Sequence, residues 1–150
     1  ERLAAIYQQD KKSDEALQEL ATAAALEISD DETLIRLMEG HAEKKRFKEV
    51  IKYGDMLIYL LPYREKSRAL LGEAWLGIGQ PGRALPHLQT AQKLLPETTD
   101  VDESDVPKLT AERQRIEALI GQAAKAKAQP FTGPQTLLDV ARQRAGLATP

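Results

Sequence analysis

Apolar residues recur along the chain at the spacing of an α-helix, and short polar or Gly-Pro breaks separate the helical stretches. The stretches fall into three pairs, at residues 1–9 with 14–28, 32–44 with 47–61, and 66–78 with 83–95. Within the pairs the breaks are DKKS, Lys45–Arg46 and GQPG, and Ser13 of the first break is suited to cap the helix that follows. The pattern therefore predicts three antiparallel helix pairs.

The same pattern returns every 34 residues. The repeating positions are Leu3, Leu37 and Leu71; Tyr7, His41 and Trp75; Ala16, Val50 and Ala84; Ala23, Leu57 and Ala91; and Pro62 and Pro96. Small residues let paired helices approach closely, and large ones fill the space around that contact. Because one helix pair cannot bury its own apolar faces, the repeat predicts pairs that stack on one another.

The third unit resembles the tetratricopeptide repeat (TPR) family. The residues that carry the resemblance are Leu71, Gly72, Trp75, Ala84, Leu88 and Pro96, with Arg68 departing from the pattern in the first bulky position. The second unit departs from the family pattern at two positions. Its corresponding residues are Leu34, Leu37, Met38, His41, Val50, Gly54 and Pro62. Met38 stands where the family has glycine, and Gly54 stands where it has a large side chain. The resemblance implies an all-α, TPR-like α-solenoid with a right-handed superhelix, a concave groove lined by first helices and a convex back.

We expect three parts in the chain: TPR-like repeats over 1–97 (1–30, 31–64 and 65–97), an acidic linker over 98–106, and C-terminal helices over 107–150. The C-terminal helices are predicted near 107–127 and 135–145, the second with Leu137, Leu138 and Ala141 on one side. They form either a degenerate fourth pair or a cap over the last apolar face.

The stretch ETTDVDESD, residues 97–105, has five acidic residues and no basic one. It lacks the mid-loop glycine and closing glutamate of a calcium loop, so a solvated linker is favoured over a calcium site.

Composition narrows the function classes. The chain has no cysteine, a formal net charge of −2 and no apolar run long enough to span a membrane. It starts at Glu1 rather than Met, so we expect a fragment of a longer protein. We expect a soluble protein, with the cytoplasm slightly favoured and the compartment otherwise unknown. The acidic balance and the lack of a basic stripe on the first helices argue against RNA binding and predict no nucleic-acid partner.

Candidate chemistry is sparse. His41 shares the repeating position of Tyr7 and Trp75, which favours a packing role, and His87 has no carboxylate at metal-ligand spacing. No phosphate loop, dinucleotide fingerprint or nucleophile elbow is present. We therefore expect no enzyme activity, cofactor or metal, and the TPR resemblance implies a protein-binding scaffold or adaptor. The alternative is an accessory or assembly domain of a larger enzyme.

One TPR subclass grips the C-terminal carboxylate of chaperones. Its Lys, Asn and Arg positions correspond here to Glu1, Ala5, Arg36, Lys66 and Leu70. Only Lys66 matches, and the chain contains no asparagine, whose amide both donates and accepts hydrogen bonds. The sequence therefore argues against this carboxylate clamp.

By the family geometry, first-helix residues should line the concave groove. They are Glu32, Ile35, Arg36, Glu39, Glu43, Lys66, Ala69 and Glu73, with Ile35 as an apolar anchor. The surface is mixed in charge but mainly acidic. It predicts an extended or helical partner that carries Lys or Arg. The alternative is that these acids serve only solubility.

The second helix of the second unit, YGDMLIYLLPY at 53–63, is more apolar than a convex helix needs. Met56 and Tyr59 share a face at i,i+3 spacing outside the packing positions. This face predicts a homodimer or partner contact, or else a surface that the C-terminal helices cover.

Overall fold

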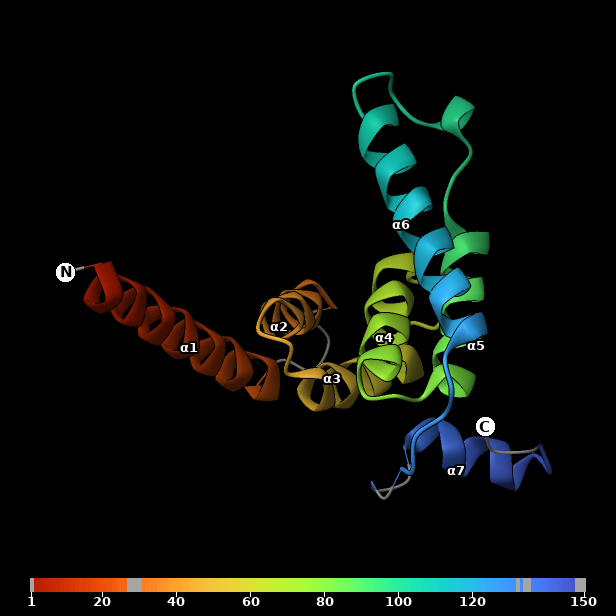
Figure 1. Ribbon diagram of the computed structural model, residues 1–150, viewed down its shortest axis with the longest axis horizontal. Coiled ribbons are helices and arrows are strands. Elements are labelled where there is room, and N and C mark those ends of the chain that lie inside the picture. The colour runs from red at the N-terminus through yellow and green to blue at the C-terminus, as the bar shows by residue number, and fades with distance from the viewer. Residues whose placement is uncertain (1, 27–30, 132, 134–135, 148–150) are drawn as a thin grey trace.

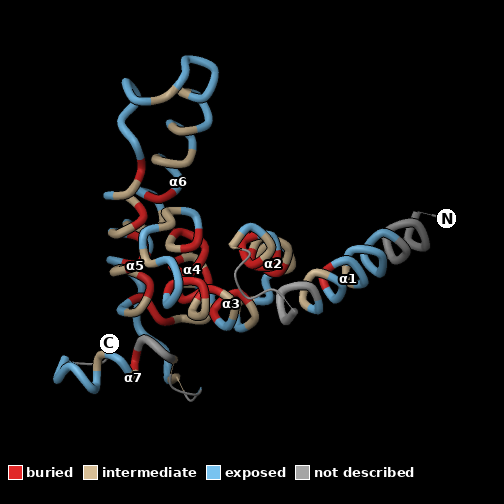
Figure 2. Tube along the Cα trace, turned by 180° about the vertical axis from the view of Figure 1, so that it is seen from behind, coloured by how far each residue is buried: buried red, intermediate tan, exposed pale blue. Residues whose placement is uncertain are grey.

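The computed structural model describes residues 2–26, 31–131, 133 and 136–147. Its elements are α1 (Arg2–Leu26), α2 (Asp31–Glu43), α3 (Phe47–Leu60), α4 (Glu65–Gly77), α5 (Pro81–Leu94), the short 3-10 helix η1 (Thr98–Asp100), α6 (Val106–Lys125) and α7 (Leu137–Arg144). Consecutive helices pack on one another from α1 to α6, so the fold is an all-α solenoid (Figure 1). Burial is concentrated in α2–α5, whereas residues 9–22 of α1 and the far end of α6 are mostly exposed (Figure 2).

The hairpins α2–α3 and α4–α5 confirm the second and third predicted pairs. Both first helices end in the same turn. Lys45 and Gly79, 34 residues apart, have positive φ values of 54° and 78°. The next amide in each case bonds back five residues, Arg46 to the His41 carbonyl and Gln80 to the Trp75 carbonyl, both at 2.9 Å. This is the Schellman arrangement, which satisfies the last carbonyls of a helix.

The close contact inside each hairpin explains the two departures from the TPR pattern. In α4–α5, a Cβ at Gly72 would clash with the side chain of Leu88. In α2–α3 the small residue is on the second helix, and a Cβ at Gly54 would lie 2.6 Å from Leu71 Cγ of α4 and 2.7 Å from Met38 Cε. Met38 and Leu71 are both buried, so their side chains together fill the space that Gly54 leaves. The large and small residues have exchanged helices.

The first predicted pair is wrong, because α1 is one unbroken helix of 25 residues. The DKKS break at 10–13 lies inside it, and Ser13 is exposed rather than a cap. This stretch holds no glycine or proline, and lysine favours helices. Residues 2–26 therefore do not form a hairpin. The side chains of Leu3, Tyr7 and Ala23 lie outside the described residues.

Charge pairs join α1 to the turn between α2 and α3. Lys44 Nζ lies 2.8 Å from Asp10 Oδ1 and 2.9 Å from Asp14 Oδ1, and Arg46 Nη1 lies 2.8 Å from the same Asp14 oxygen. Hydrogen bonds from Arg46 and Lys44 lower the pKa of Asp14 to about 2. Asp10 of the predicted break and Asp14 directly after it thus hold α1 against the next hairpin.

The C-terminal helices form close to their predicted positions. Pro107 is in the first turn of α6, where its missing amide hydrogen costs nothing. α7 begins with a capping box in which Thr136 and Asp139 each accept a hydrogen bond from the other's backbone amide. α6 packs mainly on α5 and α7 packs on α3, so the two helices cover different faces of the repeats.

Candidate functional site

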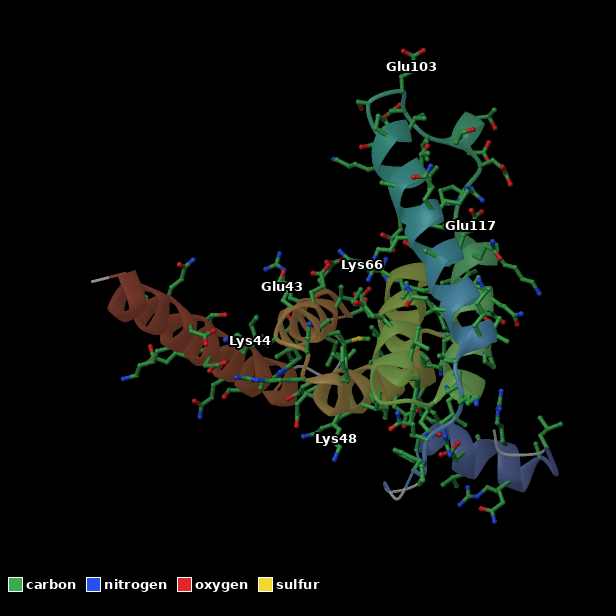
Figure 3. All side chains as sticks on the ribbon, in the orientation of Figure 1. Glu43, Lys44, Lys48, Lys66, Glu103 and Glu117 are labelled. Carbon is green, nitrogen blue, oxygen red and sulfur yellow. The ribbon has the colours of Figure 1, made fainter. Side chains whose placement is uncertain are left out.

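A surface hollow lies between the first helices and α6. Ala42 and Glu43 of α2, Leu70 and Glu73 of α4, and Arg115 of α6 line a space of 320 Å³. Figure 3 shows Glu43 and Lys66 in the open angle between α2 and α6. This "α2–α4–α6 hollow" corresponds to the predicted concave groove, except that α6 supplies one of its walls.

The hollow continues into a space of 520 Å³ between α4, the end of α5 and α6. Ala69, Leu70, Leu95 and Ile116 form a buried apolar floor there, and Leu109 is half-buried beside them. The rim is charged on both sides, with Glu39, Glu65, Lys66, Lys108, Glu112 and Arg115. An apolar floor inside a charged rim is the usual composition of a protein-binding surface.

Most acids predicted for the groove are neutralised within the molecule. Glu39 lies 2.5 Å from Lys66, Glu32 lies 3.0 Å from Arg64, and Glu73 pairs with Arg115. Among the described residues, Glu43 is the groove acid for which no ion pair is found. The hollow is therefore less acidic than its sequence indicates, and among its described lining residues Glu43 and Glu65 are the acids without an ion pair.

The structure changes the predicted roles of four groove residues. Ile35 is only 3% exposed and belongs to the core, so it is not a surface anchor. Ala69 is buried as well, in the floor of the hollow. Glu32 and Arg36 are exposed but lie outside the hollow lining. Helical periodicity identifies a face but does not tell which neighbours cover it, and Ile35 lies where α2 meets the rest of the core.

Sequence reasoning missed the residues that α6 contributes. Leu109, Ile116, Leu119 and Ile120 recur at helical spacing in the predicted 107–127 helix, which the sequence assigns to a degenerate fourth pair or to a cap. That face does pack on the repeats, with Ile116 buried against Ala69 and Ala91. However, Leu109, Glu112 and Arg115 also extend the groove. The charged residues Glu112 and Arg115, beside the apolar face, were the sequence signal that α6 contributes to the groove.

The C-terminal segment covers part of the predicted convex face. Met56 is half-buried and faces a space of 400 Å³ beneath the C-terminal segment. Tyr59 and Tyr63 are each 78% exposed, and Leu60 and Leu61 lie between them with large exposed fractions. The C-terminal segment thus covers the Met56 side and leaves the Tyr59 side open.

The C-terminal segment is fastened to the α4–α5 hairpin by backbone and side-chain bonds. The Gln129 amide donates to the Gly79 carbonyl at 2.8 Å, and Gln80 Nε2 donates to the Gln129 carbonyl at 2.5 Å. Arg83 Nη1 donates to both carboxylate oxygens of Asp139, at 2.5 and 2.6 Å. These contacts join residues about fifty positions apart.

Arg83 also lies between two aromatic rings. Its guanidinium carbon is 5.0 Å from the Trp75 ring centroid and 5.1 Å from that of Phe131, within cation–π range. Burial alone would raise the pKa of Asp139, but hydrogen bonds from Arg83 and the Thr136 backbone outweigh it and hold that pKa below its usual value. The carboxylate therefore stays ionised and keeps its arginine partner.

The two histidines are structural. His87 is 4% exposed, and burial, together with the nearby Arg68, lowers its pKa to about 4. Its Nδ1 lies 3.1 Å from Arg68 Nη1, and because arginine only donates, Nδ1 accepts and the ring is neutral. His41 stacks on Tyr53 at 5.8 Å between centroids, and burial lowers its pKa too.

Within residues 2–26, 31–131, 133 and 136–147, no group of three His, Cys, Asp or Glu side chains is placed to hold a metal ion. Nor does any helix in the same ranges combine the length and apolar character needed to cross a bilayer.

Comparison with known proteins connects the chain to a regulatory family. A family profile described as "Bacterial transcriptional activator domain" matches residues 3–117, which extend from α1 into α6. No curated protein sequence gives a significant match. The matched region contains both hairpins and both sides of the α2–α4–α6 hollow, whereas Phe131, α7 and the contacts of Arg83 with them involve residues beyond it.

Proposed function

The chain belongs to the bacterial transcriptional activator domain family, and we propose that it is a non-catalytic, protein-binding domain of such an activator. Its α2–α4–α6 hollow receives a segment of a partner protein. The observation that carries this proposal is the apolar floor around Leu70 and Leu95, with half-buried Leu109 beside it, inside a rim of mixed charge. The position of the hollow within the matched residues supports it.

The chemistry of the hollow indicates what kind of segment fits. Half-buried Leu109 and the floor around Leu70 favour apolar side chains of the partner. Glu43 favours one basic side chain beside them. Because Glu39, Glu73 and Lys66 already have partners, we do not expect recognition of a strongly basic peptide.

The family bears on two further predictions: the alternative of an enzyme accessory domain and the absence of a nucleic-acid partner. An accessory domain of a larger enzyme is disfavoured, because the matching family is described by transcriptional activation and not by catalysis. The absence of a nucleic-acid partner stays a prediction, because transcriptional activation takes place on DNA. A titration of the domain with double-stranded DNA at increasing salt tests that prediction, since phosphate contacts weaken steeply with salt.

The test uses the activator that carries this domain. Glu43→Lys with Leu109→Asp reverses the charge of the hollow and places a carboxylate on its floor. Glu19→Lys with Leu147→Asp makes the same chemical changes at exposed positions elsewhere. We expect the hollow variant to lose its partner in affinity capture and to lose target transcription, with the control variant unaffected. Full capture and transcription by a folded hollow variant would contradict the proposal.

A second contact surface is proposed at Tyr59, Leu60, Leu61 and Tyr63. Exposed tyrosines clustered with leucines favour association with another protein surface, including a second copy of this chain. Tyr59→Glu is expected to lower the mass measured by light scattering if the chain self-associates. An unchanged mass, with no partner lost in affinity capture, would remove this surface from the proposal.

A further inference from the structure

A second cavity lies on the opposite side of the repeats from the hollow. It is the 400 Å³ space between α3 and the C-terminal segment, within the range of about 300–1,000 Å³ typical of small-molecule sites. Its walls are mainly apolar: Ile51 and Met56 from α3, Trp75 and Ile78 from α4 and its end, and Phe131 from the segment after α6.

The contacts of the C-terminal segment fix the outer wall of this cavity. Phe131 meets Trp75 edge to face, with ring centroids 5.4 Å apart and an angle of 72° between the rings. The Arg83–Asp139 pair and the Gln80–Gln129 bond hold the chain on both sides of Phe131. The cavity is therefore formed before any ligand binds, which lowers the conformational cost of binding.

Two lysines lie at the mouth of the cavity. Lys48 and Lys52 are one turn apart on α3 and both are exposed, and Figure 3 shows Lys48 extending away from the ribbon below α3. In the part of the chain that the structure describes, neither ammonium has an ion pair, although Lys52 lies 5.4 Å from the Tyr53 ring centroid. Asp55, also in the lining, has an interaction of its own within the protein.

We propose that this cavity binds a small amphipathic anion: an apolar chain or ring with one anionic head group. The apolar part lies between Met56, Trp75 and Phe131, and the head group meets Lys48 and Lys52 at the mouth. Such a ligand contacts the repeats and the C-terminal segment together, so it stabilises the segment in its docked position. Phe131 lies beyond residues 3–117, so one wall of this small-molecule site comes from outside the part of the chain that matches the family.

Trp75 gives a direct readout, because it is the single tryptophan of the chain and lies in the cavity wall. The probe is decanoate, titrated below its micelle concentration, with decanol as the neutral partner of the same chain length. We expect saturable change in Trp75 fluorescence with decanoate, about tenfold weaker binding of decanol, and a rise in Tm with decanoate concentration. No saturation with decanoate, or equal affinity for the two probes, would overturn the proposal.

Matched variants locate the binding. Lys48→Gln with Lys52→Gln is expected to weaken decanoate binding about tenfold and leave decanol binding unchanged, because only the anionic head uses the lysines. Lys12→Gln with Lys93→Gln removes two exposed lysines elsewhere and is expected to change neither affinity. Phe131→Ala removes a wall and is expected to weaken both probes. Decanoate binding that survives both the lysine variant and Phe131→Ala would place it outside this cavity and contradict the assignment.

Discussion

The hairpins α2–α3 and α4–α5 share a turn and a period but fill the contact between their helices in opposite ways. In α4–α5 the first helix supplies the small residue, Gly72, and the second supplies Leu88. In α2–α3 the first helix supplies Met38 and the second supplies Gly54. What the repeat maintains is the volume at the contact, which close packing demands, and not the residue at each position.

The hairpins also differ in polarity at equivalent positions. Buried Leu34 on α2 corresponds to Arg68 on α4, and Tyr53 on α3 corresponds to His87 on α5. Arg68 donates from Nε to the Pro62 carbonyl at 3.0 Å and contacts His87. The arginine therefore fills a core position with its stem and satisfies polar groups with its head, which is why it is tolerated in a bulky apolar position.

The largest expected effect comes from filling the closest contact. Gly72→Leu would force its new side chain against Leu88, and we expect a loss of about 3 kcal/mol in the free energy of unfolding. Urea denaturation followed by circular dichroism measures it. Gly121→Leu on α6 is the control, since a Cβ there meets nothing within 4 Å. The control is expected to gain roughly 0.5–1 kcal/mol, because glycine disfavours helix interiors. Equal effects at both sites would refute the close-contact account.

Exchanging the residues of the first hairpin tests the comparison itself. Met38→Gly leaves a void and Gly54→Leu overfills the contact, so each single variant is expected to lose stability. The double variant restores the small residue on the first helix and the large one on the second, as in the second hairpin, while Leu71 of α4 still lies against position 54. We expect it to be more stable than the sum of the singles by about 2 kcal/mol in a double-mutant cycle. Additive losses would show that Met38 and Gly54 do not compensate each other.

A smaller effect is the pH dependence of stability that buried His87 of the second hairpin contributes. The usual pKa of histidine is 6.5, whereas that of folded His87 is about 4. Between these values the unfolded chain binds a proton that the folded chain excludes, so the free energy of unfolding falls as pH drops below 6.5. From pH 7 to pH 5 we expect a loss of roughly 1–2 kcal/mol from this group.

His87→Gln keeps a hydrogen-bond acceptor for Arg68 but does not titrate. It is expected to lose less stability than the parent protein over the same pH range, in denaturation curves at matched ionic strength. His41 is present in both proteins and cancels in the difference. Identical pH dependence of the two proteins would be inconsistent with a neutral, buried His87.

The smallest expected effect concerns the shared turn. Lys45 has a φ of 54°, in the left-handed region where Gly79 lies in the second hairpin. Lys45→Gly removes the steric cost of that conformation, so we expect a gain of about 0.5–1 kcal/mol in the free energy of unfolding. Lys12→Gly, within exposed helix, is expected to lose a similar amount. A loss in the Lys45 variant would contradict the equivalence of the two turns.

The sequence predicted what depends on local chemistry and periodicity. Gly79 and Pro81 mark a break that the backbone requires, and the 34-residue period located both hairpins. DKKS looked like a break through its polarity alone, and without glycine or proline the helix continues. Polarity permits an exposed helix as readily as a turn.

Contacts between helices far apart in the chain were harder to predict from the sequence. Ile35 was expected at the surface, yet the neighbours of α2 bury it. Arg83 and Asp139 are 56 residues apart, and neither has a local pattern that marks its partner. The same holds for Arg115, which closes the hollow by pairing with Glu73. The contacts of these residues depend on the rotation from one helix pair of the solenoid to the next. The 34-residue pattern of the sequence does not reveal that rotation.

The claim that the α2–α4–α6 hollow receives a partner protein can be tested by photocrosslinking. A benzoylphenylalanine replaces exposed Glu43 in the activator, and a second version carries it at exposed Glu19 on α1. Both are irradiated under conditions in which the activator stimulates transcription. The account predicts a defined protein crosslink from position 43 and none from position 19. Transcriptionally active protein that crosslinks from neither position, or equally from both, would contradict it.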